Sequence, residues 1–142
     1  MAARKGLGTI QGAHGSMTIL QNDSSFGPGE TLELVRIQNL VGDSFKRVDS
    51  IVLRQAIETS LSEAGYLQGS NADVVMLVQI TEFTNRPAKK ELKLNVELSR
   101  SGEGIAAAEI TADLNGFGSE DSVAQALGRA CVRFIKEISR SL

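Results

Sequence analysis

The chain has few of the residue types that catalysis and metal binding usually need. Its 142 residues include one histidine, one cysteine, one tyrosine and no tryptophan. A general base needs an orienting partner and a nucleophile within reach, and a zinc site needs several ligands. His14 and Cys131 alone provide neither set. We therefore expect a protein that is not an enzyme and that holds no metal or other cofactor.

Long apolar runs and a strong net charge are also missing. No stretch approaches the ~20 apolar residues that a helix needs to cross a bilayer. Fifteen basic and seventeen acidic residues give a formal net charge of −2, whereas nucleic-acid binders are usually basic. Five phenylalanines and one tyrosine leave little material for stacking bases. The sequence therefore favours neither a membrane-spanning helix nor a nucleic-acid partner.

What is present is an ordinary globular composition. Hydrophobic residues make up 42% of the chain and charged residues 23%, and the length fits one domain. The N-terminal segment is the exception, because glycines at positions 6, 8, 12 and 15 separate scattered apolar residues there. Such a segment cannot bury enough apolar surface to order itself. We expect residues 1–16 to be a flexible N-terminal tether and residues 17–142 to form a single α+β domain.

Alternating patterns predict the strands of this domain. The clearest alternation is at residues 92–98, where every second residue is Leu or Val and the residues between them are polar. Residues 73–83 are apolar on both faces, as in a strand from the middle of a sheet. A turn at residues 101–104 leads into a return strand whose apolar row is mostly small: Ala106, Ala108, Ile110, Ala112 and Leu114.

Two weaker strand patterns come earlier in the chain. Residues 16–21 form a short candidate, and residues 31–37 form a second one whose alternation slips at Val35, which indicates a β-bulge. Clusters of turn-forming or polar residues predict loops at residues 22–29 and 85–90.

Helical periodicity predicts two helices. Between residues 43 and 64 one apolar stripe is followed by Gly65, which is suited to a left-handed C-terminal cap. That helix either is buried on two sides in its first turns or begins nearer Ser50. The second helix follows Ser119, a suitable N-cap. The stripes consist of Leu53, Ile57, Leu61 and Ala64 in the first helix, and of Val123, Leu127, Ala130, Cys131, Phe134 and Ile138 in the second.

The order of these elements predicts the fold class. Strand, helix, three strands and a final helix, with the 16–21 strand as an addition, give β-α-β-β-β-α. Helices on one face of an antiparallel sheet are a common solution for such an order. The small side chains of the return strand leave room for a helix to lie across them. We expect an α+β fold with a mainly antiparallel sheet of about four strands and two amphipathic helices on one face.

The last helix also carries a basic stripe. Arg129, Arg133, Lys136 and Arg140 recur at helical spacing, opposite the apolar stripe. This stripe could contact lipid head groups, an acidic partner or a polyanion. Alternatively, it is a solvated face whose cations complement the helix dipole. We treat these four residues as the candidate interaction surface.

The remaining ionisable residues give no case for an active site. Cys131 falls on an apolar stripe, where a free cysteine behaves as a small hydrophobic residue; an intermolecular disulfide would require a half-exposed helix. Glu82 shares the register of the apolar face of residues 74–80, near the strand end. We expect the other strand carboxylates, which are Glu97, Glu109 and Asp113, to be solvated.

From residue 48 to its end, the chain resembles the compact domain of small Gram-negative envelope lipoproteins, including the YajG-type family and related families of unknown function. The matching motifs are Ala64-Gly65-Tyr66, Ala72-Asp73, Ile80-Thr81-Glu82-Phe83 and Gly116-Phe117-Gly118. The resemblance implies a periplasmic domain that a lipid on an N-terminal cysteine anchors to the outer membrane. Position 1 is Met1 instead. We therefore expect a mature domain without its leader, with residues 1–16 as the spacer to the membrane; the alternative is a cytoplasmic protein.

The resemblance and the scarcity of catalytic residues together favour a non-enzymatic lipoprotein domain that acts through protein–protein contacts. Its partner would be an envelope protein or a second copy of the chain, bound through a sheet edge, because an edge strand offers unpaired backbone groups. The alternative is a cytosolic protein that binds a small ligand or a polyanion through the basic stripe of the last helix.

Overall fold

The computed structural model of the protein describes residues 8–12, 15–23, 30–41, 50–87, 89–113 and 120–140. Several sequence expectations concern positions outside these ranges. They are His14, Leu114, Ser119, most of the loop at residues 22–29, and the start of the helix expected from residue 43.

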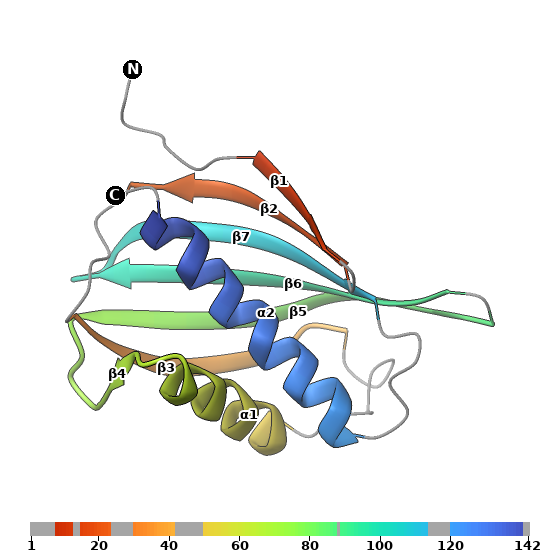
Figure 1. Cartoon of the computed structure of the whole chain (residues 1–142), viewed down its shortest axis with the longest axis horizontal. Coiled ribbons are helices and arrows are strands. Elements are labelled where there is room, and N and C mark those ends of the chain that lie inside the picture. The colour runs from red at the N-terminus through yellow and green to blue at the C-terminus, as the bar shows by residue number, and fades with distance from the viewer. Residues whose placement is uncertain are drawn as a thin grey trace.

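The described residues form a seven-stranded sheet and two helices (Figure 1). The strands are β1 (Gly8–Gly12), β2 (Gly15–Asn22), β3 (Thr31–Asn39), β4 (Leu67–Gln68), β5 (Val74–Arg86), β6 (Lys89–Arg100) and β7 (Glu103–Asp113). The helices are α1 (Ser50–Glu63) and α2 (Glu120–Arg140). The order across the sheet is β1-β2-β7-β6-β5-β3-β4.

The α+β class is confirmed, but the expected sheet of about four antiparallel strands is only roughly right. β3 pairs with β5 and with β4 in parallel, so the sheet is mixed. The reason is the position of α1, which lies between β3 and β5 in the chain. A helical crossover brings the chain back to the same end of the sheet, and the next long strand therefore runs in the same direction.

The tether expected at residues 1–16 is wrong for the part that the structure describes. Residues 8–12 form β1, and β2 already begins at Gly15; the two pair from Gly8–Ile19 to Gly12–Gly15. Backbone hydrogen bonds order this segment, and glycine can make them without contributing a buried side chain. The strand expected at residues 16–21 is confirmed as part of β2.

Four β-bulges or register shifts interrupt the described strands. The one in β3 lies between Leu34 and Arg36 and confirms the slip expected at Val35. A second lies at Leu20 in β2, a third at Thr81 in β5 and a fourth at Ile105 in β7. Because one extra residue reverses the alternation, Glu82 leaves the register of the apolar face and is exposed.

The segment at residues 85–90 is a hairpin and not the expected loop. β5 and β6 pair as far as Arg86 and Lys89, so that the strands continue almost to the turn. Cross-strand backbone pairing again outweighs the polar composition. The turn expected at residues 101–104 is confirmed, because Ser101 and Gly102 have φ angles of 52° and 82°, as a tight hairpin turn requires.

Both helices lie on the same face of the sheet, with α2 crossing the strands and α1 beside β3 (Figure 1). The apolar row of β6 and the described small residues of β7 are buried on this face, as expected. Gly65 has a φ angle of 89°, which confirms the left-handed cap after α1. The buried residues of the two expected helix stripes are Leu53, Ile57 and Leu61 in α1, and Val123, Leu127, Cys131, Phe134 and Ile138 in α2.

The two helices approach closely where α2 contains a glycine. A Cβ atom at Gly128 would lie 2.8 Å from the Ala56 carbonyl oxygen and 2.8 Å from Ser60 Oγ. Ala124, Val132 and Ile135, outside the expected stripe, are buried as well. The apolar surface of α2 is therefore wider than the stripe, because α1 covers one flank while the sheet covers another.

This contact predicts that Gly128→Val destabilises the protein. The added carbon atoms would collide with the backbone of α1, and overpacking of this kind costs about 1–3 kcal/mol in the free energy of unfolding. Gly69→Val is the matched control, since nothing lies within 4 Å of a Cβ atom there. Urea denaturation followed by circular dichroism measures both variants. Equal stabilities for the two variants would contradict the close helix contact.

Candidate functional site

The basic stripe of α2 forms one wall of a groove. Arg129 and Lys136 are exposed and Arg133 is half-buried, whereas the side chain of Arg140 lies outside the described part of the chain. The groove has a volume of about 530 Å³ and runs between α1 and α2. Its residues are Ser60, Glu63 and Ala64 from α1 and Arg129, Val132, Arg133, Lys136 and Glu137 from α2. Sequence periodicity alone did not reveal that α1 supplies the opposite wall.

Acidic residues in the same groove offset much of its positive charge. Glu63 faces the stripe from α1, and Glu137 lies beside it on α2. Three cations therefore share the groove with two carboxylates. The groove therefore contains charges of both signs, and it does not concentrate positive charge in the way that a polyanion site does.

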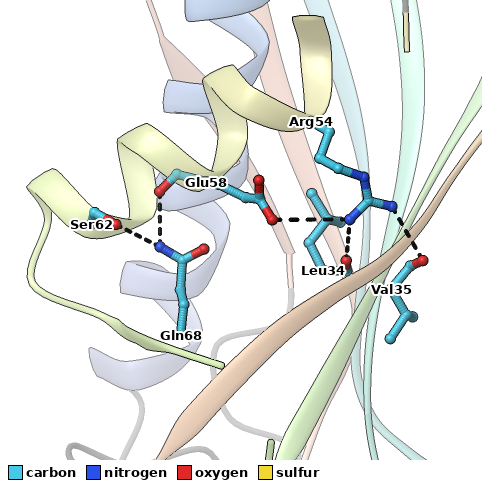
Figure 2. A network of polar contacts seen from close by, with 6 residues as sticks. All are labelled: Leu34, Val35, Arg54, Glu58, Ser62 and Gln68. Atoms are coloured by element: carbon cyan, nitrogen blue, oxygen red, sulfur yellow. Dashed lines mark hydrogen bonds and ion pairs between the residues drawn. The ribbon is translucent and has the colours of Figure 1, made fainter. Parts of the chain in front are cut away.

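A network of polar contacts joins α1 to the edge of the sheet (Figure 2). Arg54 Nη1 donates a hydrogen bond to the Leu34 carbonyl oxygen at 2.5 Å, and Arg54 Nη2 donates one to the Val35 carbonyl oxygen at 3.2 Å. Glu58 Oε2 lies 4.0 Å from Arg54 Nη1. A guanidinium group has several donors in a fixed plane. The Arg54 side chain can therefore donate hydrogen bonds to the carbonyl oxygens of two successive residues at the bulge of β3.

The connection after α1 covers the neighbouring part of the same edge. Gln68 Nε2 donates hydrogen bonds to the Glu58 carbonyl oxygen at 2.9 Å and to Ser62 Oγ at 2.7 Å. β4 pairs with the first two residues of β3, and the Gly69 N–H donates to the Leu32 carbonyl oxygen at 3.4 Å. Residues 31–35 of β3 are thus already engaged by the chain itself.

These contacts restrict where a partner strand can pair with an edge of the sheet. The first half of β3 cannot accept a partner strand without displacing Arg54 or β4. At the opposite end of the sheet, β1 has β2 as its only neighbour among the strands that the structure describes. Residues 8–12 therefore form an open edge along their whole length, and the sequence predicted no strand for this segment.

We expect Arg54→Met to open the β3 edge. The variant keeps a long apolar stem but leaves the Leu34 and Val35 carbonyls without their donor, at a cost of about 1 kcal/mol in the free energy of unfolding. It should also raise the fraction of high-mass species in light scattering, because an unprotected edge invites strand pairing. Arg129→Met, at an exposed position of α2, is the control. Unchanged stability and mass in Arg54→Met would show that the network does not protect the edge.

The face of the sheet away from the helices, here called the outer face, is mostly polar. A row of side chains crosses five strands in register: Thr18, Glu109, Asn95, Gln79 and Gln38. Gln79 Nε2 donates a hydrogen bond to Gln38 Oε1 at 2.8 Å. This row matches the expectation that the sheet has one wet face.

An apolar depression interrupts the outer face next to this row. Val35, Val75 and Leu77 line it, together with Arg36, Glu97 and Ser99, and its volume is about 310 Å³. We call these six residues the Leu77 patch. The sequence carried a signal for it, because residues 73–83 are apolar on both faces. That pattern was interpreted only as a central strand.

The strand carboxylates mainly make local contacts. Glu97 and Glu109 are exposed, as expected, but Asp113 is half-buried and has a polar or charged partner. Glu82 Oε2 lies 3.7 Å from Lys93 Nζ. None of these residues joins a cluster of three or more metal-binding side chains within the described ranges.

Two further carboxylates, those of Glu30 and Asp73, lie next to the start of β3. Asp73 Oδ2 accepts hydrogen bonds from the Thr31 N–H at 3.2 Å and from Thr31 Oγ1 at 3.0 Å. The first of these bonds, supported by the second, holds the pKa of Asp73 below its ordinary value. Glu30 forms an ion pair with Arg100 of β6. These contacts fasten the segment before β3 to its neighbours.

Cys131 is fully buried on α2, which confirms that it acts as a small hydrophobic residue and excludes the intermolecular disulfide. Burial raises the pKa of its thiol from 9.0 to about 12. As the pH rises, the thiol loses its proton in the unfolded chain before it does so in the folded chain, because its pKa is lower in the unfolded chain. The contribution of Cys131 to stability is therefore complete below pH 9 and is lost between about pH 9 and 12.

The buried thiol predicts negligible reaction with Ellman's reagent at pH 8. The reagent needs an accessible thiolate, and the folded protein offers neither access nor ionisation. In urea the same thiol should react fully within the mixing time. The absorbance of the released reagent anion follows both reactions. Prompt reaction of the folded protein would contradict the burial of Cys131.

Within the described residues, neither helix is long and apolar enough to span a membrane.

No protein-family model matches the chain, and no curated protein matches it either. The resemblance to YajG-type lipoproteins therefore stays a prediction. Among solved structures, a variant of PelC from Paraburkholderia phytofirmans, described as a dodecamer, matches with 16% identity and a TM-score of 0.63. The match covers 88% of this chain and 97% of that one. A second PelC dodecamer structure gives 14% identity and a TM-score of 0.62, with the same coverage.

Two other structures are more distant. A PDZ domain protein from Parabacteroides distasonis has 10% identity and a TM-score of 0.53 over 92% of this chain and 37% of that one. A lipoprotein from Neisseria meningitidis has 14% identity over 75% of this chain and 98% of that one, but its TM-score of 0.40 is too low to carry an argument. The chain thus shares its fold with PelC over nearly the whole length of that protein.

Proposed function

We propose that the protein is a non-enzymatic module of the cell envelope that acts through protein contacts and associates with copies of itself. The observation that carries this proposal is the fold shared with PelC, a protein solved as a dodecamer, over 97% of the PelC chain. Since the match covers 88% of this chain and 97% of the PelC chain, self-association would be a property of the fold that the two share.

The envelope address rests on the sequence. The motifs from residue 48 onwards resemble Gram-negative envelope lipoproteins, which are anchored through an N-terminal lipid. An anchored domain meets other copies in two dimensions, which raises its effective concentration and allows weak contacts to suffice. Outer-membrane anchoring in the periplasm is therefore part of this proposal.

The edge of β1 is a suitable contact for self-association. Its outer side faces no other described strand, and an open edge presents N–H and C=O groups to a partner strand. A second β1 can pair with it in antiparallel fashion about a two-fold axis, since the same surface then serves both copies. The edge at β3 is less suitable, because Arg54 and β4 already engage residues 31–35.

We expect proline in β1 to weaken self-association. Successive residues of a strand direct their N–H groups to opposite sides, so one of Thr9→Pro and Ile10→Pro removes a donor from the open edge. That variant should weaken association by about tenfold or more. Thr9→Ala and Ile10→Ala are matched controls that keep both N–H groups. Sedimentation equilibrium measures the mass, and circular dichroism checks folding.

Two results together would contradict the proposed function. One is a purified chain that sediments as a monomer at every concentration. The other is the absence of any crosslinked partner when the natural protein is crosslinked in native membranes. Self-association that resists both proline substitutions would leave the function standing but would reject the β1 edge as its site.

The alternative function, binding of a small ligand or a polyanion by the basic stripe, has weaker support. Glu63 and Glu137 share the groove with the stripe, and Arg133 and Glu137 already have polar or charged partners. A polyanion would meet these carboxylates as well as the cations. We therefore favour protein contacts.

A further inference from the structure

The Leu77 patch is an apolar area on a face that no element of the described chain covers. Both helices pack on the opposite face of the sheet (Figure 1). Val75 and Leu77 alternate along β5 with Val74, Met76 and Val78, which are completely buried under the helices. Val35, the extra residue at the bulge in β3, is 46% exposed. The patch therefore has apolar side chains where a wet sheet face normally has polar ones.

The strand register arranges charges symmetrically about Leu77. Leu77 pairs with Arg36 of β3 on one side and with Glu97 of β6 on the other. Adjacent strands lie about 4.8 Å apart, so the two charged residues flank Leu77 at similar distances. The row across the three strands is therefore a cation, an apolar side chain and an anion.

Both charged side chains are available to a partner. Arg36 and Glu97 are exposed, and no ion pair found within the described ranges involves either of them. By contrast, Glu82 of β5 and Lys93 of β6 are already paired with each other. Two charges without an ion pair among the described residues thus line the apolar depression of the outer face.

We propose that the Leu77 patch binds the same patch of a second copy, face to face, about a two-fold axis that passes close to Leu77. This inference rests on the proposed self-association and adds a surface separate from the β1 edge. When this axis lies between the two sheets and runs parallel to the strands, the row of one copy meets the row of the other in reverse order. Arg36 of each copy then faces Glu97 of the other, while the two Leu77 side chains meet at the centre.

The charge pattern favours a second copy over other occupants. A lipid surface or an acidic ligand would select a patch of one sign, whereas this row contains one charge of each sign, equally placed about an apolar centre. Two sheets pack face to face about 10 Å apart, with interdigitating side chains. The aliphatic residues supply most of the affinity in such a contact, and the charge pairs mainly fix orientation and specificity. The polar row beside the patch suits the rim of an interface.

A charge-swap experiment tests the arrangement. Arg36→Glu and Glu97→Arg should each weaken self-association by about tenfold, because like charges then face each other across the axis. The double variant Arg36→Glu/Glu97→Arg restores opposite charges and should return to within about threefold of the natural chain. Arg86→Glu and Glu103→Arg, at exposed positions outside the patch and the groove, control for the change in net charge. Sedimentation equilibrium gives the association constants.

A second variant tests the apolar centre. Leu77→Gln introduces a polar side chain on the outer face of β5. The strand already carries the same side chain two residues further along this face, at Gln79. The substitution should weaken association by about tenfold while leaving the thermal transition of the monomer within a few degrees of that of the natural chain.

The outcomes separate this inference from the proposed function. A natural chain that is monomeric throughout would overturn this inference, and it would also overturn the proposed function if no crosslinked partner is found in native membranes. An oligomer whose association is unchanged by all three single substitutions would overturn only the Leu77 contact and leave self-association through another surface. If both single charge variants weaken association but the double variant does not restore it, the charges do not meet across a two-fold axis, and the proposed arrangement is wrong.

Discussion

The close contact between α1 and α2 at Gly128 is the constraint on which the rest of the structure depends. Two helices share one face of the sheet only because a glycine on α2 meets the Ala56 carbonyl and Ser60 of α1. The small side chains of β7 lower the surface beneath α2 in the same way. As a result, the whole apolar core lies on one side of the sheet. Besides the groove between the helices, the outer face and the two sheet edges are open to another molecule.

The two edges differ because only one of them lies beside a helix. Since α1 precedes β4 and β5 and packs beside β3, Arg54 can reach the carbonyl groups exposed by the β3 bulge. β1 has no helix in a comparable position. The bulge has a second consequence, because the shift in register pairs Arg36 with Leu77 and so places it on the outer face. One irregularity in β3 thus offers the carbonyl groups that Arg54 binds and supplies the cation beside Leu77.

Side-chain periodicity predicted the elements that bury side chains on one face. Leu92 to Leu98, the stripes of both helices and the slip at Val35 are visible because burial repeats with the geometry of the element. The β1 strand and the hairpin at residues 85–90 were missed because backbone hydrogen bonds hold them, and such bonds leave no pattern in glycine or polar sequences. The parallel pairing of β3 and β5 was missed for another reason: periodicity identifies strands but not their neighbours. The groove and the Arg54 network likewise depend on which elements become adjacent.

The apolar residues on both faces of β5 have two physical explanations. A strand in the middle of a sheet can be covered by layers on both sides, or it can be covered by its own chain on one side and by another molecule on the other. The positions of α1 and α2 exclude the first explanation for the described chain, since both helices lie on the same face. Solvent exposure of Val35, Val75 and Leu77 would carry a hydrophobic cost without a compensating contact in the monomer. A polar residue at 77 would remove that cost, as Gln79 does for the adjacent row. The presence of leucine there, between an unpaired cation and an unpaired anion, is therefore better explained by contact than by folding.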